Sequence, residues 1–273
     1  LEGMVAATFT PLDENGDVNL SVIDKYADWI ASTPIKGVFV CGTTGEFSSL
    51  TIDERKLILE KWLVSARKRF KVIAHVGSNC QRSAMELARH AAQVGADAIA
   101  SIAPSFFKPG TVDELVDFFA PICHSAAGLP FYYYNMPSIT GVNLPVDKFL
   151  VEGKKKIPNL VGTKFTHNNL MEMGVCIELE QHRFEVLHGY DEILISGLAM
   201  GAVAGVGSTY NYIPNVYQAI FDSMKMNDLE TARHNQIKSI RTVEVIIKYG
   251  GGVRGGKAIM KLIGIDCGSC RLP

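Results

Sequence analysis

A lysine at the end of an apolar segment has the clearest chemical potential in this sequence. Lys164 lies near the end of the apolar run 160–165, and lysine is almost never buried without a partner. Apolar surroundings penalise the charged ammonium, and the neutral amine is a nucleophile towards a carbonyl carbon. Lys164 is therefore a candidate for covalent catalysis through an imine. The alternative is a lysine whose chain extends past the apolar run to solvent.

A second candidate lies in the run 130–135, which contains three consecutive tyrosines. Alternation along a strand sends Tyr133 to one face and both Tyr132 and Tyr134 to the other. A phenol both donates and accepts a proton, so Tyr134 is a candidate proton relay. The alternative is a core aromatic whose hydroxyl group is bonded to a carbonyl.

A short polar segment, residues 42–46, follows the run 37–41. Its two glycines permit tight turns, and the hydroxyl groups of Thr43 and Thr44 converge there with several backbone amides. Such a loop can hold a carboxylate or a phosphate. The alternative is a polar turn that leads into the next helix.

Polar side chains also follow the last two apolar runs. Asp191 and Glu192 come after Gly189, and carboxylates are strong acceptors for the hydroxyl groups of a polyol. The alternative is that they cap a helix beginning at Ile193. Ser208 follows the final run among small residues, which let a ligand approach the backbone.

Two segments approach nucleotide-binding motifs without matching them. Residues 251–257 nearly spell a phosphate-binding loop, but Ala258 replaces the metal-ligating Ser or Thr and residues 243–249 indicate a preceding helix. Tyr210 replaces the last glycine of a dinucleotide fingerprint. The seven histidines show no spacing typical of metal ligands, so neither a metal nor a cofactor is expected.

The composition excludes several classes of protein. The 27 basic and 28 acidic side chains give a net charge of −1, which argues against a nucleic-acid-binding or polybasic membrane-surface protein. No apolar run approaches the ~20 residues that span a bilayer, so a soluble protein is expected, and the scattered cysteines favour a cytoplasmic one. Among six cysteines only Cys267 and Cys270 form a C-x-x-C pair, and reduced thiols are expected.

The rest of the sequence provides a scaffold for these side chains. Eight short apolar runs alternate with longer amphipathic segments, as buried parallel strands alternate with helices. An uninterrupted series of eight predicts one α/β domain over residues 1–273, a (β/α)8 TIM barrel, whose chemistry lies in the loops after the strands. The runs are residues 4–10, 37–41, 72–76, 98–103, 130–135, 160–165, 184–189 and 202–207.

Helix starts are predicted by capping boxes, in which a hydroxyl group and a carboxylate three residues later bond to free backbone amides. Such a pair satisfies donors that have no partner within the helix. The predicted boxes pair Thr51 with Glu54, Ser83 with Glu86, and Thr111 with Glu114.

Three motifs together resemble the family of Schiff-base lyases that contains N-acetylneuraminate lyase and dihydrodipicolinate synthase. They are Gly-Thr-Thr-Gly-Glu at 42–46, Tyr-Asn-Met-Pro at 134–137 and Gly-Thr-Lys-Phe at 162–165, on the second, fifth and sixth runs. The resemblance extends over the length of the chain. Residues 188–192 and 207–211 are similar to the sialic-acid lyase branch in its animal-like form.

Two departures from the synthase branch agree with this resemblance. Ile139 stands where synthases carry an arginine for a second carboxylate, and Phe107 stands where they have a tyrosine shared between subunits. Family members continue with further helices, so C-terminal helices cut short at Pro273 are expected. The resemblance also implies a homotetramer that acts on a small molecule, with no nucleic-acid or membrane partner.

The resemblance implies a role for each candidate residue. Lys164 would form an imine with the C2 ketone of N-acetylneuraminate, and cleavage of the C3–C4 bond would yield N-acetylmannosamine and pyruvate. Tyr134 would relay the proton, while Thr43 and Thr44 would hold the substrate carboxylate. Two alternatives stay open: another pyruvate lyase with a different aldehyde, and a non-catalytic barrel that binds sialic acid. The sugar side would be lined by Thr166, Gly189, Asp191, Glu192 and Ser208.

Overall fold

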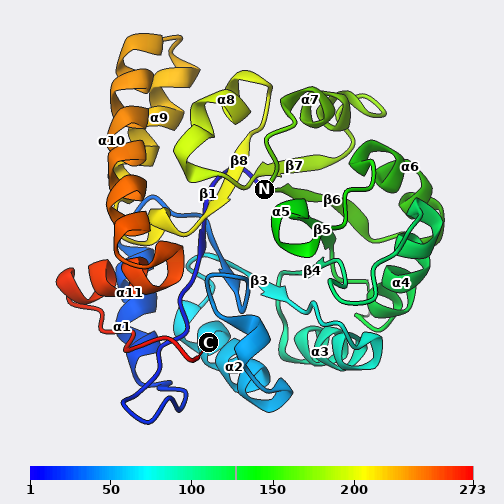
Figure 1. Cartoon of the computed structure of the whole chain (residues 1–273), viewed down its shortest axis with the longest axis horizontal. Helices are drawn as coiled ribbons and strands as arrows, with labels where there is room; N and C mark the ends of the chain where they lie inside the picture. Colours follow the sequence, from blue (N-terminus) through cyan, green and yellow to red (C-terminus); the bar gives the residue numbers. More distant parts are fainter. Residues whose placement is uncertain (127, 273) are drawn as a thin grey trace.

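Eight parallel strands form a closed barrel at the centre of the molecule (Figure 1). The structure, a computed structural model, describes residues 1–126 and 128–272. Each strand pairs with the next, and β8 returns to β1, with Val5 opposite Val206. The prediction of a (β/α)8 barrel is therefore confirmed. The strands are β1 (Gly3–Ala7), β2 (Gly37–Val40), β3 (Lys71–His75), β4 (Ala98–Ile102), β5 (Phe131–Asn135), β6 (Leu160–Phe165), β7 (Glu185–His188) and β8 (Ala204–Gly207).

Helices form a ring around the barrel, and three of them follow β8 at one side of the ring, at the left of Figure 1. These three are α9 (Pro214–Lys225), α10 (Leu229–Lys248) and α11 (Gly251–Leu262). The ring itself contains α1 (Val22–Ala31), α2 (Ile52–Ala66), α3 (Gln81–Val94), α4 (Val112–His124), α6 (Val146–Lys156), α7 (Leu170–Glu178) and α8 (Leu194–Ala199), whereas the short α5 (Pro137–Thr140) lies inside the ring beside β5. Short 3-10 turns are η1 (Phe47–Ser49), η2 (Asp191–Ile193) and η3 (Thr209–Asn211).

The side chains of the strands divide between two buried layers. Tyr132 and Tyr134 belong to the cluster inside the barrel, whereas Tyr133 belongs to the layer between strands and helices. The Tyr133 ring lies 4.6 Å from that of Phe149 and 5.5 Å from that of Phe119, measured between centroids. The predicted alternation along β5 is confirmed, and it places the Tyr134 hydroxyl group inside the barrel.

The predicted capping box at the start of α2 is confirmed. Thr51 Oγ1 accepts a hydrogen bond from the Glu54 amide at 3.2 Å, and Glu54 Oε2 accepts one from the Thr51 amide at 2.8 Å. At α4, Thr111 Oγ1 accepts from the Glu114 amide, but the Glu114 carboxylate accepts from the amide of Gly110 at 2.6 Å. Only half of that box is formed, because the carboxylate binds one residue further back.

The predicted box between Ser83 and Glu86 is wrong. Helix α3 begins at Gln81 with Cys80 as its N-terminal flanking residue, so Ser83 lies within the first helical turn. Glu86 instead pairs with Lys56 on the neighbouring helix α2. The box fails because the helix begins before Ser83, and no sequence pattern within α3 reveals Lys56 as the partner of Glu86.

The segment that resembles a phosphate-binding loop is helical. Residues 251–257 are the first turns of α11, and the preceding α10 includes residues 243–248, as predicted. The cysteines are free thiols, and Cys267 is buried. In residues 1–126 and 128–272, no group of three or more His, Cys, Asp or Glu side chains is placed to hold a metal ion. No helix there is long and apolar enough to cross a membrane.

Candidate active site

Lys164, the one lysine among the candidate site residues, has its side chain buried inside the barrel. It lies on β6 with 4% of its surface exposed. Its Nζ atom lies 4.0 Å from the centroid of the Tyr134 ring and 4.5 Å from that of Phe39. The faces of aromatic rings attract a cation but do not neutralise it as a carboxylate would. The two aromatic faces therefore hold the amine at a defined position inside the barrel.

Tyr134 lies beside Lys164 because the two residues are register partners on β5 and β6. Its Oη atom is 3.2 Å from Thr43 Oγ1 and 3.1 Å from Met136 Sδ. Either oxygen can be the donor between Tyr134 and Thr43. The phenol thus joins the amine on one side to the loop after β2 on the other, a position suited to moving a proton.

The loop after β2 has a constrained backbone. Cys41 and Glu46 adopt φ angles of 55° and 56°, in the left-handed region that non-glycine residues rarely occupy. Gly45 packs so closely that a Cβ atom there would lie 3.1 Å from the Cα atom of Cys41. This tight turn presents Thr43 and Thr44 to the barrel interior, where both line the same cavity as Lys164.

His75, at the end of β3, supports both the loop and the tyrosine. Its Nδ1 atom is 2.8 Å from the carbonyl oxygen of Cys41, and its Nε2 atom accepts a hydrogen bond from the Ile102 amide at 3.3 Å. Its ring lies 5.9 Å from the Tyr134 ring in an edge-on arrangement. Burial holds the pKa of His75 well below its usual range, so the ring is neutral. The Nδ1–H tautomer satisfies both bonds.

Thr166 and Gly189 meet after β6 and β7. A Cβ atom on Gly189 would lie 2.8 Å from the Cβ atom of Thr166, so only glycine allows this approach. The Oγ1 atom of Thr166 is buried and has no hydrogen-bond partner among the described residues. A buried hydroxyl group without a partner is unfavourable, and a ligand in the adjoining cavity would satisfy it.

The two carboxylate oxygens of Asp191 differ in their surroundings. Its Oδ2 atom accepts hydrogen bonds from the amide of Thr209 at 2.8 Å and from its hydroxyl group at 2.7 Å. Its Oδ1 atom is buried without a partner among the described residues. Burial raises the pKa of Asp191 to about 6 in spite of the bonds from Thr209.

The alternative role of Asp191 and Glu192 as helix caps is wrong. Neither side chain caps η2 or α8, and the free amide of Ile195 in α8 donates to Gln236 Oε1 of α10 at 2.9 Å. The cap therefore comes from a side chain 41 residues further along the chain. This leaves the Glu192 carboxylate available to a ligand.

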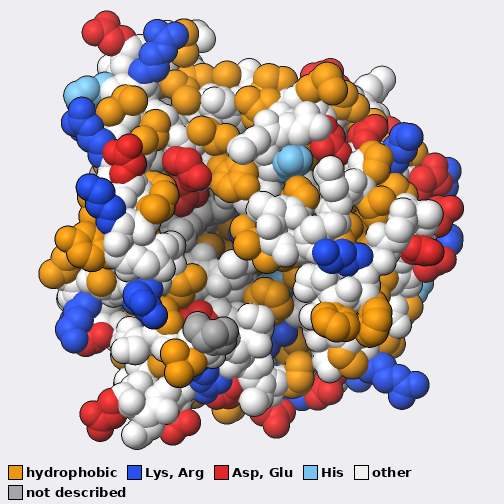
Figure 2. Space-filling model, viewed as in Figure 1, with side chains coloured by type: hydrophobic (Ala, Val, Ile, Leu, Met, Phe, Trp, Pro, Cys, Tyr) orange, Lys and Arg blue, Asp and Glu red, His pale blue; other side chains and the backbone are white. Residues whose placement is uncertain are grey.

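All of the candidate residues line one cavity of about 260 Å³ at the ends of the strands. Figure 2 shows the molecule hollowed at the centre of its ring of helices. The pocket collects side chains from six strands or their loops, as the barrel topology requires. Its predicted members are Thr43, Thr44, Tyr134, Lys164, Thr166, Gly189, Asp191, Glu192 and Ser208.

Several lining residues were not found from the sequence. Ala7 and Val206 are inward-facing strand residues, and Met136 lies within the Tyr-Asn-Met-Pro motif, so alternation and motif position could have indicated them. Gly252 and Val253 begin helix α11. No local signal marks these two, because they lie on a helix after the eighth strand and not in a loop directly after a strand.

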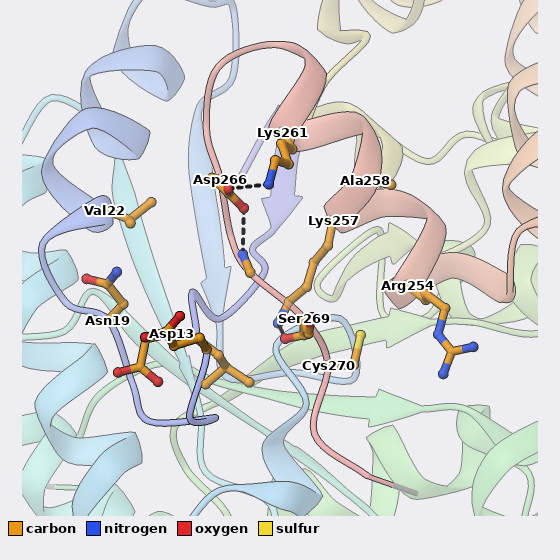
Figure 3. A pocket seen from close by; sticks show the side chains of 13 residues that line it. Asp13, Asn19, Val22, Arg254, Lys257, Ala258, Lys261, Asp266, Ser269 and Cys270 are labelled. Carbon is orange, nitrogen blue, oxygen red and sulfur yellow. Dashed lines mark hydrogen bonds and ion pairs between the residues drawn. The ribbon is translucent and has the colours of Figure 1, made fainter.

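A larger cavity, of about 820 Å³, lies between the N-terminal loop, α11 and the C-terminal segment (Figure 3). Carboxylates and cations both line it, among them Asp13, Arg254, Lys261 and Asp266. None of the candidate residues lines this cavity. The larger cavity therefore contains none of the predicted chemistry, whereas the smaller one contains the buried amine of Lys164.

The whole chain, residues 1–273, matches the model of the dihydrodipicolinate synthetase family. The chain belongs to this family. Among curated relatives, N-acetylneuraminate lyase of Mus musculus is 43% identical, covering 100% of this chain and 87% of the relative. The lyase of Gallus gallus is 44% identical and is 90% covered.

Solved structures of the dihydrodipicolinate synthetase family superpose closely on the barrel. N-acetylneuraminate lyase of Proteus mirabilis has a TM-score of 0.97 at 37% identity, covering 100% of this chain and 92% of that one. Dihydrodipicolinate synthase of Aquifex aeolicus has a TM-score of 0.92 at 26% identity, with coverage of 100% and 92%. Identity is higher to the two vertebrate lyases than to the bacterial one, as the resemblance to the animal-like form implies.

Proposed function

We propose that the protein is a Schiff-base aldolase that reversibly cleaves N-acetylneuraminate to N-acetylmannosamine and pyruvate. One observation carries the proposal: the buried Lys164 amine lies 4.0 Å from the ring of Tyr134, whose hydroxyl group is bonded to Thr43 in the same cavity. The names of the relatives support it, since 40–44% identical proteins over the full chain are N-acetylneuraminate lyases. One solved structure is of a catalytic lysine mutant of the Ruminococcus gnavus sialic acid aldolase.

The geometry supports an ordered series of proton and bond changes. Lys164 Nζ attacks the C2 ketone, and the ketone oxygen leaves as water. The protonated imine accepts the electrons of the C3–C4 bond while the C4 hydroxyl group loses its proton, and N-acetylmannosamine departs as the aldehyde. The remaining enamine gains a proton at C3, and water then releases pyruvate from Lys164. Tyr134 lies within reach of both the imine and Thr43 to move these protons.

The two ends of the cavity suit the two ends of the substrate. The hydroxyl groups and amides of Thr43 and Thr44 form a site for the carboxylate next to the imine carbon. Thr166, Glu192 and Ser208 lie along the other side. Their acceptors and donors are suited to the hydroxyl groups of a sugar-derived chain.

A second candidate function is another pyruvate lyase of the family with a different aldehyde. The acidic side of the cavity disfavours an aldehyde that carries a carboxylate, because Asp191 and Glu192 would face it. Ile139, where the synthase branch has an arginine, is 61% exposed and offers no cation. A polyhydroxylated aldehyde is therefore favoured.

Trapping with borohydride tests the proposal. Incubation with pyruvate followed by borohydride should reduce the imine to a stable secondary amine on Lys164, which peptide mapping locates. An adduct on Lys257 or Lys261 would refute the assignment of Lys164. A protein that binds N-acetylneuraminate but gains no adduct would be the non-catalytic barrel.

We also propose that the protein acts in the cytoplasm as a homotetramer. The resemblance to the family supports this assembly, and so does one exposed apolar surface. Phe106 and Phe107 are 77% and 87% exposed, with their rings 5.0 Å apart. An exposed aromatic pair favours burial at a subunit contact. Sedimentation equilibrium should give four times the mass of the chain, and a monomer at micromolar concentration would contradict the assembly.

A further inference from the structure

Glu46 ends the loop that carries Thr43 and Thr44, and its carboxylate is taken up by a buried ion pair. Its Oε1 atom lies 2.6 Å from the Nζ atom of Lys257 on α11. The two side chains are 8% and 2% exposed. Each of these two buried charges is stabilised by the other, because removal of one leaves the other unpaired in a medium of low dielectric constant.

Two glycines let α11 pack closely against its neighbours, Gly256 against Phe9 after β1 and Gly255 against Ile246 of α10. A Cβ atom on Gly256 would lie 2.7 Å from Cε1 of the Phe9 ring and still closer to its Cζ atom, and one on Gly255 would lie 2.9 Å from the Ile246 side chain. Lys257 is held further by the carbonyl oxygen of Ser269, to which its Nζ atom donates at 2.8 Å (Figure 3). The glycine-rich segment therefore serves close helix packing rather than phosphate binding.

The C-terminal segment restrains the same loop. The Arg271 amide donates to Glu46 Oε2 at 3.0 Å, and its guanidinium group donates to the carbonyl oxygen of Ser49 at 2.7 Å. The guanidinium group also pairs with Glu54, and this bond lowers the pKa of Glu54 to about 2. Arg271 thus binds the loop at Glu46, at its exit and at the first turn of α2.

The backbone of the loop requires such restraints. Cys41 and Glu46 are both in the left-handed region, a conformation that persists only where neighbouring groups hold it. His75 holds the Cys41 end, and the Thr10 hydroxyl group holds the carbonyl oxygen of Gly45 at 2.7 Å. Lys257 holds the Glu46 end. The two threonines lie between these anchors.

We propose that the Lys257–Glu46 ion pair is a positioning device that fixes the loop in the shape that binds the pyruvate carboxylate. Both are positioning residues, since they act through Thr43 and Thr44 rather than on a reacting atom. The inference rests on the proposed function, because it takes pyruvate as the ligand. Affinity for the carboxylate, rather than the rate of C–C bond formation, should then depend on the pair.

The test is steady-state condensation of pyruvate with N-acetylmannosamine by the full chain. Lys257→Met keeps the length of the side chain and removes its charge. The KM for pyruvate is expected to rise about tenfold or more, with kcat changed less than about threefold, because binding is lost and chemistry is retained. The matched control is Lys261→Met on the same helix, whose ion pair with Asp266 is exposed. This control should leave the KM unchanged.

A second variant keeps the test decisive if Lys257→Met does not fold. Glu46→Gln combined with Lys257→Met leaves no buried unpaired charge, and it should also raise the KM for pyruvate while imine trapping at saturating pyruvate stays complete. A wild-type KM in the folded variants, with or without a lower melting temperature, would overturn the positioning role alone. Absence of a pyruvate adduct on the wild-type protein would overturn the proposed function and this inference with it.

Discussion

Asp191→Asn probes the electrostatics of the cavity through the stability of the protein. The side chain of Asp191 is 5% exposed, and burial raises its pKa from 3.8 to about 6. The folded pKa exceeds the unfolded pKa, so the protonated carboxyl group stabilises the folded state. This stabilisation is complete below about pH 4 and is lost as the pH rises through about 6. The ionised carboxylate therefore makes the folded state less stable at neutral pH.

The magnitude follows from the size of the shift. About two pKa units, at about 1.4 kcal/mol per unit, correspond to about 3 kcal/mol in the free energy of unfolding. Roughly 2 kcal/mol of this falls between about pH 4.5 and about pH 8, because the unfolded carboxylate is already partly ionised at the lower pH. Asparagine does not titrate and lacks this dependence. Any destabilisation caused by the new amide itself is the same at both pH values, so it cancels when the two pH values are compared.

Urea unfolding of the wild-type protein and Asp191→Asn across this range gives the measurement. The free energy of unfolding of the variant, minus that of the wild type, should increase by about 2 kcal/mol from about pH 4.5 to about pH 8. Asp228→Asn is the control, because bonds from Thr231 lower the pKa of that exposed carboxyl and it stays ionised throughout. Parallel profiles for Asp191→Asn and the wild type would refute a raised pKa at Asp191.

Three further outcomes are expected from the geometry of the cavity. Tyr134→Phe should keep the melting temperature and lower kcat about 10²–10⁴-fold. The control Tyr132→Phe, on the same strand, should leave kcat unchanged. Equal values of kcat for the two variants would make the Tyr134 hydroxyl group structural. Glu192→Gln should raise the KM for N-acetylneuraminate about tenfold or more with kcat nearly constant, and a fall in kcat alone would instead place Glu192 in proton transfer. Because Ile139 supplies no cation, aspartate semialdehyde should condense poorly with pyruvate; rapid condensation in a coupled assay would contradict the sugar-aldehyde assignment.

The strands, and the gathering of the candidate residues in one cavity, could be predicted because each has a local cause. Parallel strands buried on both faces are short and uniformly apolar, so the run containing Lys164 stands out in the sequence. A polar residue at the end of such a run must lie at the mouth of the barrel, because all strand ends meet there. Tyr134 and Thr43 were found for this reason, although 91 residues separate them.

The predictions that failed depend on neighbours distant in the sequence. Glu86 was expected to cap its own helix, but Lys56 on the facing helix pairs with it. Gly252 and Val253 line the cavity although they belong to α11, a helix that follows the last strand, and not to a loop directly after a strand. Local patterns indicate which groups a segment offers, whereas packing decides which partner each group takes.

Asp191 shows how packing can give one carboxylate a role that neither local interpretation contained. The sequence offered a polyol ligand or a helix cap, yet Oδ2 is bonded to Thr209, which joins the loop after β7 to the loop after β8. Gly207 makes this possible, since a Cβ atom there would overlap the Asp191 carboxylate, Oδ1 most of all. Only Oδ1 remains for a ligand, so a substrate contact would come from a carboxylate already fixed in orientation. A fixed acceptor loses less conformational entropy on binding than a mobile one, which favours its use in selecting the substrate.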